Sequence, residues 1–153
     1  MNSSPSLKTI LKEVKERDEV SGRLANKTDR IELRRKGIEE LFDSIQGWLQ
    51  PSVDEGLVEL RREVYVHSDK QLGMLTEESL TLVVGASEIF VAPRAGSIAG
   101  ATVRVDITRN ELTLPVVLMP DRGWHFLIRD QITRTEPVTE ASFVEVLKEL
   151  LAA

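Results

Sequence analysis

The segment Gly85-Ala86-Ser87-Glu88-Ile89 comes closest in this chain to a motif for nucleophilic catalysis. The nucleophile elbow has the pattern Gly-x-Ser-x-Gly, in which a strand precedes the serine and a helix follows it. Here Ile89 replaces the final glycine, and Ser87 lies between two segments rich in strand-forming residues. The pattern therefore argues against Ser87 as a nucleophile.

Acid–base and imidazole–metal chemistry depends on His67 and His125, because the chain has only two histidines. They lie in different predicted strands, and neither has a histidine or carboxylate nearby at the spacing of metal ligands. With no cysteine, the chain has no thiolate nucleophile or thiolate ligand. The phosphate-binding and dinucleotide-binding glycine motifs are also missing. We expect no catalytic residue, metal site or cofactor, which favours a protein that is not an enzyme.

A weaker pattern points to an anion-binding site. Its residues are Arg94, Arg104, His125 and Arg129. Arg94 lies in a turn of small residues, where its guanidinium can bind a carboxylate or a phosphate. The same small residues are typical of an ordinary hairpin loop. Arg104 and Arg129 can share the solvated face of a sheet, where ion pairs with residues such as Asp106 explain them without a ligand.

A basic stretch lies near the N-terminus. Between Ser21 and Gly37 there are six basic and two acidic residues, so the local charge is 6 − 2 = +4. On a helix, four of the basic residues fall within an arc of about 60°; these are Arg23, Lys27, Arg30 and Arg34. Such a stripe can bind an acidic protein surface. The alternative is a solvated helix face with intrahelical pairs such as Glu32 with Lys36.

The same region carries apolar residues at intervals of seven: Leu24, Ile31, Ile38 and Ile45. This spacing is typical of helices that pair with one another. A parallel pair would place Lys27 against Lys27 and Arg34 against Arg34, so the sequence favours an antiparallel or offset pair. We expect a homodimer whose contacts include Arg23, Leu24, Lys27, Arg30, Ile31 and Arg34.

The element that carries this stripe is predicted as a helix over residues 5–49. It has an apolar stripe at its start, formed by Leu7, Ile10, Leu11 and Val14. No glycine or proline lies between Leu24 and Lys36, which favours one long or gently broken helix. A hairpin with its turn at Ala25–Asp29 is the alternative. The helical region is expected to end at Gly47, Pro51 and Gly56.

A series of short strands follows, separated by glycine, proline, asparagine and aspartate. They are predicted at Glu59–His67, Leu80–Gly85, Glu88–Pro93, Ile98–Thr108, Leu112–Met119 and Trp124–Arg129. Glu59–His67 has the mixed charges of an edge strand, and the polar segment Ser68–Glu78 is predicted mostly as loop. Val103, Val105 and Ile107 alternate with polar residues, which predicts one buried and one solvated sheet face.

The chain is expected to end in a helix that begins after Pro137 and is capped by Thr139. Its apolar stripe consists of Phe143, Val146, Leu147, Leu150 and Leu151. Short connections between the strands favour antiparallel pairing. The prediction is an α+β protein with a helical arm over residues 1–50 and an antiparallel sheet with the C-terminal amphipathic helix packed on it over residues 51–153. The sheet is predicted as a curved sheet or partly closed barrel of about six strands.

Composition narrows the function. The 153 residues carry a net charge of −5, which disfavours nucleic acid as a partner. No signal-peptide pattern and no apolar run of about 18 residues occurs, which predicts a cytoplasmic protein without a membrane span. The predicted function is a non-catalytic interaction or assembly module that uses its N-terminal helix. The alternative is a small-molecule-binding protein or hydrolase with its site in the concavity of the sheet.

Overall fold

The computed structural model describes residues 3–96, 102–129 and 133–153, and the side chains of these residues except 3–5, 17–26, 129 and 133. Its first element is α1, a helix from Ser3 to Asp54. Residues Ala25–Asp29 are helical, so the alternative of a hairpin turn there is wrong. The chain divides into two compact units, Met1–Leu33 and Arg34–Ala153, and the division lies within α1.

The end of α1 lies later than predicted. Gly47 and Pro51 lie inside the helix, and Gly56 follows its end with a φ of 75°. A positive φ is accessible to glycine without the steric cost that a Cβ atom brings. The N–H of Leu57 donates to the carbonyl of Ser52 at 2.9 Å, which satisfies a carbonyl of the last turn. Pro51 has no N–H to donate to the carbonyl of Gly47, so the helix lacks one backbone hydrogen bond close to its end.

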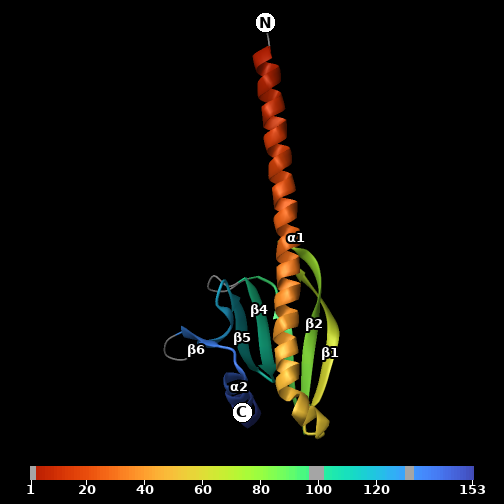
Figure 1. Ribbon diagram of the computed structural model, residues 1–153, viewed down its shortest axis with the longest axis vertical. Coiled ribbons are helices and arrows are strands. Elements are labelled where there is room, and N and C mark those ends of the chain that lie inside the picture. Colours follow the sequence, from red (N-terminus) through yellow and green to blue (C-terminus); the bar gives the residue numbers. More distant parts are fainter. Residues whose placement is uncertain (1–2, 97–101, 130–132) are drawn as a thin grey trace. The chain divides into compact units, whose positions relative to one another are not determined.

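A seven-stranded antiparallel sheet follows in the order β1-β2-β3-β4-β5-β6-β7, and it does not close into a barrel (Figure 1). The strands are β1 (Glu59–Asp69), β2 (Gly73–Val84), β3 (Ser87–Arg94), β4 (Val103–Arg109), β5 (Leu112–Met119), β6 (Gly123–Arg129) and β7 (Thr133–Pro137). The predicted α+β class with an antiparallel sheet is confirmed, and β1 lies at an edge as expected.

Two strand predictions were wrong. The polar segment Ser68–Glu78 is mostly strand, because β2 begins at Gly73. Strand β7 occupies Thr133–Pro137, where the sequence predicted no strand between Arg129 and the last helix. The first part of the strand predicted at Ile98–Thr108 lies outside the described residues.

The core of the second unit lies between the helices and one face of the sheet. Residues 34–54 of α1 contribute Ile38, Phe42 and Ile45, all of which are buried. The C-terminal helix α2 (Glu140–Ala152) contributes the predicted stripe, with Phe143, Val146 and Leu150 buried. Thr139 caps α2 in a capping box with Ser142, as predicted for the cap residue.

The hairpin of β1 and β2 extends beyond its neighbour β3. Strands β1 and β2 are paired from Glu59↔Val83 to Asp69↔Gly73. Strands β2 and β3 are paired only from Leu80↔Val91 to Val84↔Ser87. Residues Gly73–Ser79 therefore pair with β1 alone, and this part of β2 is free to approach α1.

Candidate functional site

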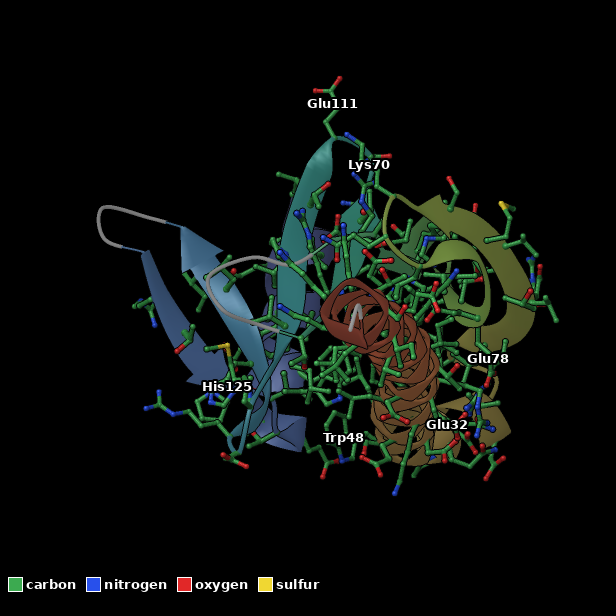
Figure 2. The ribbon with its side chains drawn as sticks, turned by 90° about the horizontal axis from the view of Figure 1, so that it is seen from above. Glu32, Trp48, Lys70, Glu78, Glu111 and His125 are labelled. Carbon is green, nitrogen blue, oxygen red and sulfur yellow. The ribbon has the colours of Figure 1, made fainter. Side chains whose placement is uncertain are left out.

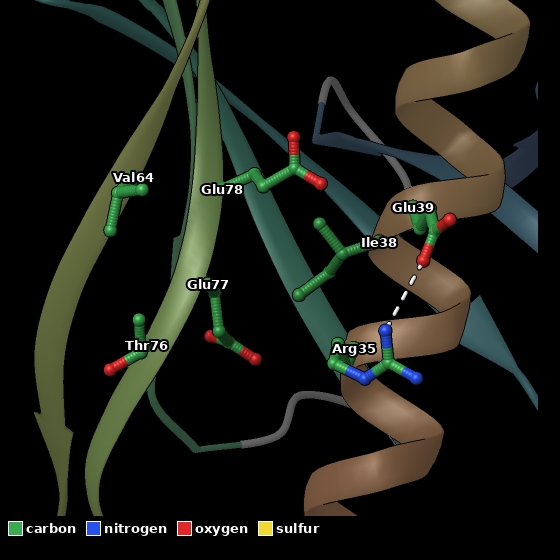
Figure 3. Close-up of a pocket in the computed structure, with 7 residues that line it drawn as sticks. All are labelled: Arg35, Ile38, Glu39, Val64, Thr76, Glu77 and Glu78. Atoms are coloured by element: carbon green, nitrogen blue, oxygen red, sulfur yellow. Dashed lines mark hydrogen bonds and ion pairs between the residues drawn. The ribbon is translucent and has the colours of Figure 1, made fainter.

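A cavity of about 220 Å³ lies between the extended hairpin and α1. Figure 3 shows its walls, with Val64 and Thr76 on the hairpin and Ile38 on the helix. The residues that line it are Arg35, Ile38, Glu39, Val64, Thr76, Glu77 and Glu78. Residues of β2 before Leu80 do not pair with β3, so side chains of α1 and not a third strand lie beside this part of the hairpin.

Arg34 and Glu77 form a buried ion pair at the inner end of the cavity. The Nε and Nη2 groups of Arg34 donate to the two carboxylate oxygens of Glu77 at 3.0 and 2.9 Å. Nη2 also donates to the carbonyl of Arg94 at 3.3 Å, and His67 Nε2 contacts the same carboxylate. The side chains of Arg34 and Glu77 are only 4% and 3% exposed, so the pair must satisfy its charges internally.

The remaining carboxylates of the cavity are also paired with cations. Arg62 donates to Glu78 and, at 2.7 Å, to Asp43 on α1. The hydrogen bond with Glu78 raises the pKa of the Arg62 guanidinium, which therefore stays charged. Glu39 accepts from Arg35 at 3.4 Å.

These pairs decide what the cavity can hold. The described residues contain no group of three or more histidine, cysteine, aspartate or glutamate side chains that could hold a metal ion. Ile38 and Val64 provide apolar wall, and each carboxylate already has a cationic partner. The cavity therefore suits a small apolar group that enters beside the sheet edge.

Three of the four predicted anion-binding residues share one row of the sheet. Arg94 is opposite Arg104, Arg104 is opposite Val117, and Val117 is opposite His125. The row lies on the face opposite the core, because Val103 and Val105 on either side of Arg104 belong to the core. Figure 2 shows His125 on β6 well apart from Glu78 on β2, so the His125 end of this row is separate from the cavity.

Asp106 occupies the place that an anion would take in this row. Its carboxylate accepts from Arg104 at 2.7 Å and lies 3.5 Å from Arg94 Nε. His125 Nδ1 lies 3.1 Å from the carbonyl of Gly123, so it donates within its own strand. Ion pairing within the chain accounts for both arginines, and ligand binding here stays a prediction. The side chain of Arg129 lies outside those described.

The predicted partner-binding residues fall into three groups. Lys27 and Arg30 are exposed and Ile31 is half-buried. The side chains of Arg23 and Leu24 lie outside those described. Arg34 is buried against Glu77, so it does not belong to an exposed basic stripe. Helical spacing could not show this, because its carboxylate partner is 43 residues away in the sequence.

Two exposed apolar groups were not included in the predicted sites. One is the first stripe of α1, where Leu7, Ile10 and Leu11 are each more than half exposed. The other is the edge strand β1, where Val64 is 73% and Val66 is 55% exposed. The spacing of both groups is visible in the sequence, but their exposure depends on what the fold places over them.

No helix among the described residues is both long enough and apolar enough to span a membrane.

Comparison with known proteins adds no further assignment. No protein-family model matches the chain, and neither a curated protein nor a solved structure matches it.

Proposed function

We propose that this protein is a non-catalytic assembly module that pairs with a second copy of itself through residues 3–33 of α1. The observation that supports this proposal is the exposure of the first apolar stripe. Leu7, Ile10 and Leu11 are 56%, 55% and 60% exposed, and Val14 is 37% exposed. Apolar residues at these intervals form one face of a helix, and burying each contributes roughly 1.5–3 kcal/mol.

The spacing of the apolar residues continues along the helix and favours a paired helix. Leu7 and Val14 are seven residues apart, as are Leu24 and Ile31. In heptad terms the first two occupy a positions and the second two occupy d positions. In an antiparallel pair centred on Glu19, Leu7 lies opposite Ile31 of the second copy and Val14 lies opposite Leu24.

The charges agree with this arrangement. The antiparallel pair places Glu13 near Lys27 of the second copy, and the two-fold symmetry repeats this contact. In a parallel pair, Lys27 of one copy lies at the same level as Lys27 of the other. The layer of Arg17 and Ser21 is polar, which weakens the pair and helps to specify its register.

Sedimentation velocity of the full chain tests the proposal. We expect a mass of at least twice the 17.2 kDa of the single chain at micromolar concentration. Leu7→Asp should weaken the pair, because it brings a carboxylate into an apolar layer. Leu33→Asp is the matched control, since Leu33 is 48% exposed and lies outside the a and d positions.

A charge exchange tests the antiparallel register. Glu13→Lys and Lys27→Glu should each weaken the pair, and the double variant should restore it. A single-chain mass for the unmodified protein, or equal effects of Leu7→Asp and Leu33→Asp, would contradict the proposal. Failure of the double variant to restore pairing would exclude this register.

A further inference from the structure

Strand β1 presents an open edge that the helix pairing does not use. It pairs with β2 on one side, and in the described part of the chain no strand pairs with its other side. Every second N–H and C=O group along such an edge points away from the sheet and can pair with another strand. The register with β2 continues without interruption over the strand, so no bulge disrupts this edge.

The charged residues of β1 lie mostly in its first half, and one more, Asp69, lies at its end. Natural edge strands avoid unwanted pairing through charged residues, prolines or bulges. The first half of β1 contains Glu59, Arg61, Arg62 and Glu63. The second half contains Val64, Tyr65 and Val66, and the two valines are 73% and 55% exposed. Met74 on β2 lies opposite Ser68 of β1, and it adds a third exposed apolar side chain on the face of the valines.

We propose that β1 pairs antiparallel with β1 of a second copy, with the two-fold axis at Tyr65. In this register Val64 lies opposite Val66 of the second copy, which joins exposed apolar side chains. Glu63 lies opposite His67 and Arg61 opposite Asp69, so acidic groups meet basic or imidazole groups. The two-fold symmetry makes each of these contacts twice.

Neighbouring registers are less favourable. Centring the pair on Arg62 or Glu63 places that residue against its own copy, so like charges meet. Centring it on Val64 places Glu59 against Asp69. The Val64-centred register keeps the same faces together, but it places Val66 opposite Arg62 of the second copy, so only one apolar pair remains. The sequence of β1 is therefore self-complementary in the Tyr65-centred register.

The cavity beside β1 is a further reason to propose β1 of a second copy as the partner strand. Val64 lines the cavity, and its side chain lies on the same face as that of Val66. Pairing brings Val66 of the second copy opposite Val64, at the wall of a space that suits a small apolar group. In recognition by strand addition, main-chain hydrogen bonds supply affinity and side-chain pockets supply specificity.

This pairing is independent of the pairing through α1. Both surfaces are isologous, so each one alone closes a dimer. A protein that uses both forms linear assemblies larger than a dimer. A variant that weakens pairing through α1 therefore still allows pairing through β1 to be tested, and the reverse also holds.

Cysteine cross-linking tests the register, because the chain has no cysteine of its own. Val64→Cys and Val66→Cys are prepared separately, mixed and oxidised in the Leu7→Asp background, which weakens the helix pairing. Directly opposite Cβ atoms are about 4.5–5.5 Å apart, so the mixed disulfide should form about tenfold faster than either like-with-like disulfide. Thr113→Cys, an exposed position on the interior strand β5, is the matched control.

The results distinguish the outcomes. Mixed disulfides in excess of random pairing, together with a smaller mass for Val64→Lys/Val66→Lys by sedimentation, support the edge pairing. Cross-linking no faster than that of Thr113→Cys would overturn it, whatever the helix variants show. Random proportions of the three disulfides would exclude the Tyr65-centred register, and docking of a different protein on this edge would then be the alternative.

Discussion

The guanidinium of Arg34 on α1 and the carboxylate of Glu77 on β2 are joined by two hydrogen bonds of 3.0 and 2.9 Å. Both side chains are buried, and the contact connects the helix to the part of β2 that extends past β3. A polar segment of the sequence therefore becomes a strand in the wall of the cavity. The same contact also reaches the end of β3 through the carbonyl of Arg94.

We expect Arg34→Met to lower the free energy of unfolding by about 3–5 kcal/mol, because it leaves a buried carboxylate without its cation. The double variant Arg34→Met/Glu77→Leu should lose less free energy of unfolding than Arg34→Met alone, because it removes both charges of the pair. Urea denaturation measures both. Arg61→Ala is the control, because its exposed pair with Glu59 should contribute at most about 1 kcal/mol. Equal losses for Arg34→Met and Arg61→Ala would contradict the importance of this buried pair.

Asp69 should make stability depend on pH under acidic conditions. Burial raises the pKa of its carboxyl, but hydrogen bonds from the backbone N–H groups of Leu72, Gln71 and Gly96 outweigh this and lower the pKa below 3.8. The resulting stabilisation is present above the ordinary pKa and is lost as the pH falls through the lowered value. As the pH falls from 5 to strongly acidic conditions, the free energy of unfolding should therefore decrease less for Asp69→Asn than for the unmodified protein. The difference is the stabilisation that the ionised carboxyl of Asp69 supplies at higher pH.

Thermal denaturation over a pH series measures this difference. Glu88→Gln, on the exposed surface of β3, is the control for the loss of a single carboxylate. An acid dependence that is unchanged by Asp69→Asn would show that other groups govern acid unfolding.

Gly37 and Gly47 provide a matched pair of helix substitutions. A Cβ atom at Gly37 would lie 2.9 Å from Leu118 Cδ2, whereas one at Gly47 meets nothing within 4 Å. The carbonyl of Gly37 also accepts from Trp124 Nε1 at 3.1 Å, so α1 and β6 approach closely here. Gly47→Ala should stabilise the protein by about 0.5–1 kcal/mol, as expected for alanine within a helix.

The Gly37→Ala variant should have a lower free energy of unfolding than the Gly47→Ala variant, because Leu118 must shift to admit the new methyl group. In a Trp48→Phe background, where Trp124 is the only tryptophan, intrinsic fluorescence reports on the same contact during denaturation. Equal stabilisation by the two substitutions would mean that the sheet accommodates the methyl group without strain.

The C-terminal helix should be required for the core. Phe143 is 1% exposed, and its ring centroid lies 5.6 Å from that of Trp48 on α1. Phe143→Ala should lower the free energy of unfolding by about 3–5 kcal/mol. Val144→Ala on the solvent side of α2, where Val144 is 42% exposed, should have a much smaller effect. Calorimetry distinguishes the two, and similar melting temperatures would show that α2 contributes little to the core.

Elements with a local apolar pattern could be predicted from the sequence. The stripe from Phe143 to Leu151 predicted α2, and Thr139 was identified as its cap. The alternation at Val103, Val105 and Ile107 predicted a strand with one buried face, and all three residues are in the core. Helix and strand periods appear in such segments because each buried side chain is apolar, whatever it packs against.

Strand formation, burial and ion pairing that depend on distant residues could be identified only in the tertiary structure. Thr76, Glu77 and Glu78 have the composition of a loop, but their backbone pairs with β1, and Arg34 and Arg62 bind the two glutamates. The exposure of Val64 and Leu7 likewise depends on which segments cover them. Spacing along the chain shows which side chains share a face, whereas burial and ion pairing depend on residues brought together from far apart in the sequence, and a local pattern contains no information about them.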